Sequence, residues 1–212
     1  GDLCRKHGCL LLLDTVTSLG GVPLYIDEWK VDLAYSCSQK GLSCPPGLGP
    51  FTMGPRAEAK MEARAGKVPN WYLDVSLLNK YWGSDRVYHH TAPVNMNFGM
   101  REALRLLAEE GVNQSWERHR QNAEALWTGL ESLGLSMHVP AERRLPTLTT
   151  VRIPEGVDGK AFSQHLLNQH GIEIGGGLGS LAGKIWRIGL MGYNSNPENV
   201  NHLLNLFETE LP

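Results

Sequence analysis

Two short apolar runs, each followed by one chemically useful side chain, constrain the fold of this chain more than any other feature. Cys9–Leu13 is apolar throughout and leads directly into Asp14. Because the run does not alternate with polar residues, it predicts a strand buried on both faces, as in a parallel sheet covered by helices. Val31–Tyr35 predicts a second strand, and Lys40 follows it before a turn rich in proline and glycine. Open α/β sheets place their ligands at the carboxyl ends of strands, so we expect Asp14 and Lys40 at one site.

Length and composition describe an ordinary globular protein and exclude several classes. The 212 residues suffice for one large domain or two modest ones, with 42% hydrophobic and 20% charged residues. A formal net charge of −2 provides no attraction for nucleic acid or an anionic membrane, so we expect neither as a partner. The longest apolar run, around Leu10–Leu13, is far too short to cross a bilayer. The cysteines show neither CxxC pairing nor metal-ligand spacing, which favours free thiols over disulfides.

The first residues read as a segment of a longer polypeptide. The chain starts at Gly1 without a methionine, and the end of a helix, closed by Gly8, runs at once into the apolar strand. No signal or transit pattern is visible. Since a buried parallel strand needs neighbours on both sides, we expect a preceding portion that supplies them.

Asp14 and Lys40 each have an ordinary alternative role. Asp14 can cap the turn over Thr15–Leu19, and a lone lysine is usually a solvated surface residue. Lys40, however, lies between small residues and the Pro45–Gly47 turn, where partial desolvation disfavours the ammonium form and makes the amine a nucleophile toward an aldehyde. Gln39 either binds a phosphate oxygen or caps the turn. An amine of this kind, together with an acid that keeps a heterocyclic nitrogen protonated, is what a pyridoxal-phosphate enzyme requires of its protein.

Several segments spread along the chain carry a family resemblance. They are Leu13–Gly21, Tyr35–Gly47, Trp82–Gly83, Tyr88–Pro93, Gly175–Gly179 and Arg187–Leu190. Together they resemble the class V, fold-type I pyridoxal-phosphate aminotransferases, and within that class the alanine–glyoxylate (serine–pyruvate) aminotransferases. The similarity spans nearly all of the chain, and the combination is highly specific even where each piece alone is weak.

The resemblance implies a pyridoxal-phosphate site around Asp14 and Lys40. Lys40 would bond the aldehyde of the cofactor, and Asp14 would pair with the protonated pyridine nitrogen. Val16 would pack on one face of the cofactor ring, and Gln39 would lie near its phosphate. The main phosphate-binding loop of the family, the aromatic that stacks on the ring and the side chain near its 3-oxygen would lie upstream of residue 1. We therefore expect an incomplete active site within these residues.

The cluster Tyr88-His89-His90-Thr91 invites interpretation as a metal site. Two adjacent histidines point in opposite directions if the backbone is extended, and no HxxxH motif or nearby carboxylate completes a zinc site. We therefore predict no metal here. The resemblance instead implies that Tyr88 and Thr91 reach the cofactor phosphate of the partner subunit, and that the full-length protein is a homodimer.

Arg187 lies in an apolar strand between Trp186 and Ile188. A guanidinium at such a position needs an anion, because an unpaired buried charge is very costly. That anion is either a structural carboxylate or a substrate carboxylate held by two parallel hydrogen bonds. The resemblance implies the substrate-binding role.

The glycine-rich segment Gly175–Lys184 precedes this strand. It fails as a Walker A loop, because Leu178 and Ile185 stand where glycine and a hydroxyl residue are required. It also fails as a dinucleotide-binding loop, because the pattern after it predicts a strand rather than a helix. We expect a flexible loop that borders the substrate site.

The remaining periodicity predicts two domains that meet at Gly111. Helices are expected over 96–111, 115–133, 159–169 and 199–211, and strands over 146–154, 172–174 and 184–189. The buried side of the second helix should comprise Trp116, Ala123, Leu126, Trp127 and Leu130. A charged helix is expected after Phe51. The aromatic-rich segment Trp71–Trp82 follows, and we expect it in the core or at a subunit interface in preference to a platform on which a ligand stacks. Residues 1–110 would be the C-terminal portion of a large α/β cofactor-binding domain, and 111–212 a small α+β domain.

The resemblance implies a transaminase that reversibly transfers an amino group from alanine or serine to glyoxylate or another 2-oxo acid. Lys40 would move a proton at the substrate Cα, while Arg187 would orient the substrate carboxylate. Two alternatives stay open, a truncated non-catalytic product that only binds partner subunits, and another class V enzyme such as a lyase or desulfurase. Family members are often peroxisomal or mitochondrial, although the chain ends Glu210-Leu211-Pro212 without a Ser-Lys-Leu signal.

Overall fold

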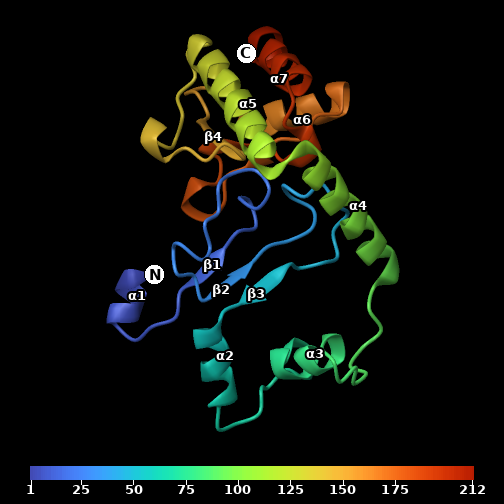
Figure 1. Ribbon diagram of the computed structural model, residues 1–212. Coiled ribbons are helices and arrows are strands. Elements are labelled where there is room, and N and C mark those ends of the chain that lie inside the picture. The colour runs from blue at the N-terminus through green and yellow to red at the C-terminus, as the bar shows by residue number, and fades with distance from the viewer.

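The computed structural model describes residues 1–212 and contains two three-stranded sheets in different parts of the molecule (Figure 1). The first sheet consists, in spatial order, of β1 (Leu12–Asp14), β2 (Leu33–Tyr35) and β3 (Phe51–Met53). β1 and β2 are parallel, with Asp14 opposite Tyr35, whereas β3 runs antiparallel to β2. The carboxyl ends of β1 and β2 therefore meet at one edge, which is where the sequence predicts the site.

β1 is not the strand buried on both faces that the sequence predicts. It is 3 residues long, and Leu12 is 57% exposed. It pairs with β2 alone, so its second edge has no strand partner within residues 1–212. An apolar run predicts that neighbouring strands and helices cover it, and within residues 1–212 only β2 pairs with β1. The preceding helix, α1 (Asp2–Lys6), ends ahead of Gly8, whose φ is +65°.

An excursion of helices leaves the first sheet after β3 and returns along α4 (Figure 1). It contains α2 (Pro55–Glu62), the short 3₁₀ helix η1 (Trp71–Leu73) and α3 (Val75–Trp82). Asp74 caps α3 by accepting the Ser76 N–H at 3.0 Å. The charged helix expected after Phe51 is confirmed as α2. Large aromatic side chains of the excursion, among them Trp71, Tyr72 and Trp82, are exposed, so a core location for them is wrong.

α4 (Val94–Glu110) and α5 (Val112–Ser132) follow one another with Gly111 between them. Gly111 has a φ of +89°, which favours glycine, and the helix axis changes direction there (Figure 1). The helices predicted over 96–111 and 115–133 are thus confirmed to within a few residues. Leu126 and Leu130 of α5 are fully buried as expected, whereas Leu104 of α4 is 48% exposed and Ala103 is the one buried residue of that helix. α5 is thus anchored in the core, and α4 extends along the surface.

The second sheet is antiparallel and packs with the last two helices. Its strands, in spatial order, are β4 (Leu148–Arg152), β6 (Ile185–Gly189) and β5 (Gly175–Gly176), and its helices are α6 (Gly159–His170) and α7 (Pro197–Glu210). Short 3₁₀ helices connect them, namely η2 (Ala141–Arg143), η3 (Gly179–Leu181) and η4 (Gly192–Asn194). The strand expected over 172–174 is wrong, because the Ile172 N–H still bonds the Leu166 carbonyl oxygen in the turn that ends α6. The other elements expected after residue 146 are confirmed to within a few residues.

The main hydrophobic core lies between the second sheet and its helices. Phe162 of α6, Trp186 of β6 and Phe207 of α7 meet there with ring centroids between 5.1 and 5.6 Å apart. Since Trp186 points into this core, its neighbour Arg187 points to the opposite face of β6. None of the helices has both the length and the hydropathy needed to cross a membrane.

Candidate active site

The segments that follow β1 and β2 are hydrogen-bonded to each other at the carboxyl edge of the first sheet. The Thr15 N–H and hydroxyl both donate to the Tyr35 carbonyl oxygen, at 2.9 and 2.7 Å. The Ser36 hydroxyl donates in return to the Thr15 carbonyl oxygen at 3.0 Å. Thr15 and Ser36 are buried, so these bonds fix the backbone of Asp14 against the segment that leads to Lys40.

Two donors hold the Asp14 carboxylate. Oδ1 accepts the Val16 N–H at 2.8 Å, and Oδ2 accepts the Tyr35 hydroxyl at 2.7 Å. The Val16 bond first, and then the Tyr35 bond, lower the pKa of Asp14, so the carboxylate is ionised at neutral pH. Asp14 therefore does cap the turn that follows it, which is one of the two roles considered for it from the sequence. A carboxylate accepts up to about four hydrogen bonds, so Asp14 keeps capacity for about two more donors.

The turn that carries Lys40 packs directly against the turn that follows Asp14. The Ser43 N–H donates to the Lys40 carbonyl oxygen at 2.9 Å and closes the first turn. A Cβ atom built on Gly41 would overlap the Leu19 carbonyl oxygen, so only glycine permits this approach of two backbones. The structure thus brings the turn after Asp14 into contact with the turn that carries Lys40, while Asp14 is not among the residues that line the cavity beside Lys40.

Lys40 lines a hollow of about 500 Å³ between its own turn and the loop that follows β6. Gln39 and Ser43 contribute from one side of the hollow, and Met191 and Tyr193 from the other. Lys40 is half-buried and belongs to none of the ion pairs of the chain, while Gln39 is exposed. Ligand pockets commonly measure about 300–1,000 Å³. Lys40 therefore differs from a fully solvated lysine and faces a space of ligand size.

The loop after β6 reaches the Lys40 turn at Gly192. Gly192 has a φ of +58°, and a Cβ atom there would overlap the Ser43 hydroxyl oxygen. That hydroxyl oxygen accepts the Tyr193 N–H at 2.8 Å. From the opposite side, Nε2 of His119 accepts the Gly192 N–H at 2.9 Å. Gly192 is therefore enclosed between the Lys40 turn and α5.

His119 and Arg118 of α5 hold this loop, and neither is among the residues predicted from the sequence. Nδ1 of the fully buried His119 donates to the Ser115 carbonyl oxygen at 2.7 Å, and burial lowers the pKa of His119, so the ring is neutral. Nη1 of Arg118 donates to the carbonyl oxygens of Gly192 and Ser195 at 2.8 and 2.6 Å. The available sequence signal is the pair Ser115 and His119, two polar residues four apart on the buried side of an amphipathic helix.

Arg187 is half-buried and has no carboxylate partner. Its Nε donates to the Gly176 carbonyl oxygen at 2.6 Å, and no ion pair of the chain includes it. Residues 1–212 thus supply no structural ion pair for Arg187, and the rest of the guanidinium retains donors for a carboxylate. Arg187 does not line the hollow beside Lys40, so the structure does not place these two residues at one cavity.

The other cofactor-binding candidates occupy two separate places. Val16 is half-buried in the turn directly after Asp14. Tyr88 and Thr91 lie in the segment before α4, with the Tyr88 hydroxyl 2.8 Å from the Thr91 hydroxyl. Both side chains are exposed, and neither lines the hollow beside Lys40. The structure thus brings Tyr88 and Thr91 to each other but not to Lys40.

His89 and His90 face one another, so the expectation that they point in opposite directions is wrong. Their Nδ1 atoms are 2.9 Å apart, because the backbone bends at this point instead of extending. His89 is buried, stacks on Trp71 with ring centroids 4.0 Å apart, and places Nε2 3.1 Å from the Trp71 carbonyl oxygen. These contacts give His89 a structural role in holding η1.

One family of proteins matches this chain over nearly its whole length. The family model described as aminotransferase class V matches residues 1–203. The alanine–glyoxylate aminotransferase of Oryctolagus cuniculus is 46% identical over 208 residues, which make up 96% of this chain and 53% of that protein. The chain therefore spans about half the length of the curated relatives it matches.

Solved structures of two transaminases are similar to the chain. An alanine–glyoxylate aminotransferase from Nostoc sp. is 64% identical with a TM-score of 0.96, covering 98% of this chain and 55% of that one. A ureidoglycine–glyoxylate aminotransferase from Bacillus subtilis is 38% identical with a TM-score of 0.94, covering 100% of this chain and 56% of that one. These likenesses confirm the fold-type I α/β architecture expected from the sequence.

Proposed function

The chain belongs to the class V aminotransferase family, and from that premise we propose that its 212 residues form part of a pyridoxal-phosphate-dependent transaminase. The reaction moves an amino group from alanine or serine to glyoxylate or another 2-oxo acid. The names of the relatives share glyoxylate but differ in the donor, which is alanine for the Nostoc protein and ureidoglycine for the Bacillus subtilis protein. Glyoxylate as acceptor therefore has broader support than any one donor.

The residues at the carboxyl edge of the first sheet fit pyridoxal phosphate chemically. Asp14 is ionised and keeps acceptor capacity for a protonated ring nitrogen. Lys40 presents an amine without an ion-pair partner to a hollow of ligand size, and the Gln39 amide lines the same hollow. Val16 adds an apolar side chain next to Asp14. When bound, the cofactor supplies an electron sink for the pair of electrons left at the substrate Cα.

Lys40 is proposed to transfer a proton of the substrate, and Arg187 is proposed to bind the substrate carboxylate. With the cofactor bound, the Lys40 amine would take the proton from the substrate Cα and deliver it to the C4′ carbon of the cofactor. The Arg187 guanidinium keeps donors free after its bond to Gly176, and these bind the substrate carboxylate as a planar fork. Arg187 does not line the hollow beside Lys40, so this role requires a substrate that reaches from that hollow to the guanidinium; its Cα–H bond would then be oriented toward the amine.

The partner subunit is proposed to complete the site. The hydroxyls of Tyr88 and Thr91, exposed and 2.8 Å apart, are arranged to bind one phosphate group together, and in a homodimer that phosphate belongs to the cofactor of the partner subunit. We also propose that the large cofactor-binding domain ends at residue 110 and that 111–212 form the small domain, with the bend at Gly111 as the boundary. A peroxisomal or mitochondrial location is proposed from the mammalian relatives.

The observation that carries this proposal is the backbone contact between the Lys40 turn and the turn after Asp14. Covalent trapping tests it without any need for turnover. The chain is incubated with pyridoxal phosphate, reduced with borohydride and mapped by peptide mass spectrometry. We expect label at Lys40 well above the label at Lys60 and Lys67, which are exposed controls. Equal labelling of the three lysines would overturn the proposal.

Product analysis with alanine and glyoxylate separates a transaminase from a lyase or desulfurase. A transaminase forms pyruvate and glycine in equal amounts, whereas a lyase or desulfurase does not consume glyoxylate. Because the chain spans about half of its relatives, we expect the isolated chain to bind the cofactor weakly and to turn over poorly. Full transamination by the isolated chain would contradict that expectation.

A further inference from the structure

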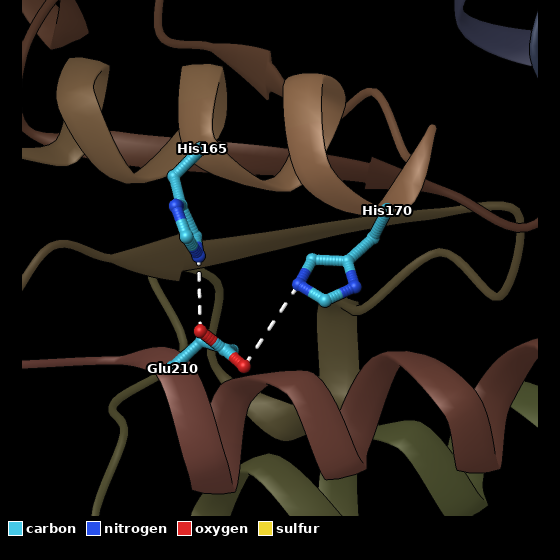
Figure 2. Close-up of side chains that lie close together, drawn as sticks. All are labelled: His165, His170 and Glu210. Carbon is cyan, nitrogen blue, oxygen red and sulfur yellow. Dashed lines mark hydrogen bonds and ion pairs between the residues drawn. The ribbon is translucent and has the colours of Figure 1, made fainter.

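We propose that His165, His170 and Glu210 bind a divalent transition-metal ion at the surface where α6 meets the end of α7 (Figure 2). Nε2 of His165 lies 2.9 Å from one carboxylate oxygen of Glu210, and Nε2 of His170 lies 3.9 Å from the other. The potential ligand atoms all lie within 4.8 Å of one another. None of these residues belongs to the candidate active site, so this proposal does not depend on the proposed function.

The backbone on both sides of the cluster is anchored. His165 is followed by the fully buried Leu166, and Glu210 is followed by Leu211, which packs against the core. The second histidine is the last residue of α6, and Gly171 ends that helix in the left-handed conformation with a φ of +67°. Both imidazoles point from α6 toward the carboxylate on α7 (Figure 2). The ligands therefore converge on positions that the fold already fixes.

Two imidazoles and one carboxylate form a ligand set that suits zinc and its first-row neighbours. Zinc binds such ligands at about 2.0–2.2 Å, so ligand atoms around a tetrahedral ion are about 3.3 Å apart. Atoms that lie within 4.8 Å of one another reach that spacing by small side-chain rotations. Magnesium and calcium prefer sets made only of oxygen ligands, so they are not expected to bind.

The exposure of the cluster suits a site with an open position. The side chains of His165, His170 and Glu210 are 42%, 26% and 34% exposed. An ion can therefore enter from solvent and keep a water molecule as its fourth ligand. An ion pair between Glu210 and one protonated histidine uses the same contacts without a metal, and direct binding measurements separate the two.

Calorimetric titration of Zn²⁺ into the untagged chain near neutral pH tests the proposal. We expect His165→Gln, His170→Gln and Glu210→Gln each to weaken binding by about tenfold or more. His202→Gln is the matched control, since His202 is an exposed histidine of α7 outside the cluster, and it should leave the affinity unchanged. Circular dichroism checks that each variant keeps the fold of the parent chain.

The free cysteines require a second probe, because thiolates also bind zinc. Co²⁺ bound by nitrogen and oxygen gives visible d–d bands without the intense ultraviolet charge-transfer band of a thiolate ligand. We expect d–d bands that are lost in His170→Gln and retained in His202→Gln. Zn²⁺ affinity that is equal in these two variants, or no binding to the parent chain, would overturn the proposal and leave the cluster an ion pair.

Discussion

Nε2 of His119 accepts the backbone N–H of Gly192 at 2.9 Å, although the two residues are 73 positions apart in the chain. Nδ1 of the same ring donates to the Ser115 carbonyl oxygen at 2.7 Å. Both bonds form together only when the ring is neutral and carries its proton on Nδ1. The protonation state of one buried histidine is thereby coupled to the loop that faces Lys40.

Acidification is predicted to destabilise the chain through His119. Burial first, and then the charge of Arg118, lower the pKa of His119, while the Ser115 carbonyl and Glu110 act in the opposite sense. Above about pH 6.5 the ring is neutral in both the folded and the unfolded chain, and the stability it contributes is fully present. As the pH falls below that value, the unfolded chain takes up the proton first, so the free energy of unfolding decreases until the folded His119 also protonates. Urea denaturation at a series of pH values measures this decrease.

His119→Leu removes the titrating group and leaves the Gly192 N–H without its acceptor. We expect the free energy of unfolding at neutral pH to fall by about 1–3 kcal/mol. The part of the acid-dependent decrease that His119 causes should disappear. His202→Leu is the matched control at an exposed histidine and should change neither quantity. An acid dependence in His119→Leu as steep as in the parent chain would contradict this account.

Gly192→Ala is predicted to be more destabilising than a simple positive-φ substitution. The added Cβ atom overlaps the Ser43 hydroxyl oxygen and also forces alanine to a φ of +58°. Gly156→Ala is the control, because Gly156 has a φ of +85° with no atom near its Cβ position. We expect Gly156→Ala to cost about 1–2 kcal/mol and Gly192→Ala to cost more. Equal urea midpoints for the two variants would show that the loop adjusts without penalty.

Gly41→Ala is predicted to reduce the reactivity of Lys40 while leaving the chain folded. The new methyl group must displace the Leu19 carbonyl oxygen, which moves the Lys40 turn relative to the turn after Asp14. A displacement of about 1 Å at a reacting group commonly costs about 100-fold in rate. The rate of borohydride-trapped labelling of Lys40 by pyridoxal phosphate measures the loss. Labelling of Lys60 in the same sample serves as the internal control and should not change.

Leu126→Ala is predicted to destabilise the chain by about 2–5 kcal/mol, because Leu126 is fully buried in the core beside the second sheet. Leu104→Ala on α4 removes the same atoms from a half-exposed position and should change the free energy of unfolding by less than about 1 kcal/mol. Chemical denaturation of the two variants provides the comparison. A large loss at Leu104 would mean that α4 is covered in solution.

Features set by residues close together in the chain could be predicted from the sequence. Asp14 and Lys40 each follow a short apolar run, and parallel pairing of the two strands brings the loops after them to one edge. The spacing of Leu126 and Leu130 identifies the buried side of α5, because helical periodicity depends only on local geometry. The period-two alternation before Pro154 identifies β4 for the same reason.

Features set by distant segments could not be predicted in this way. His119 reads as a polar residue on a helix until Gly192 is placed against it. The apolar run that contains Leu12 predicts neighbouring strands on both sides, but its sequence does not indicate whether residues 1–212 contain them. His89 and His90 face one another because the backbone bends, and no motif in that segment specifies the bend.

Glu110 precedes the bend at Gly111 and Arg118 follows it. Their side chains are joined by hydrogen bonds of 2.5 and 2.9 Å, which stabilise the bend. The Arg118 guanidinium also donates a hydrogen bond to the Gly192 carbonyl oxygen. One side chain therefore connects the loop beside Lys40 to the C-terminal end of α4. α4 has 17 residues and is therefore a rod of about 25 Å. Tilting that rod by about 10° at its base swings the far end, where Thr91 lies, by about 4 Å. The position of Thr91 therefore depends on the angle between α4 and α5 at Gly111, which the hydrogen bonds between Glu110 and Arg118 help to fix.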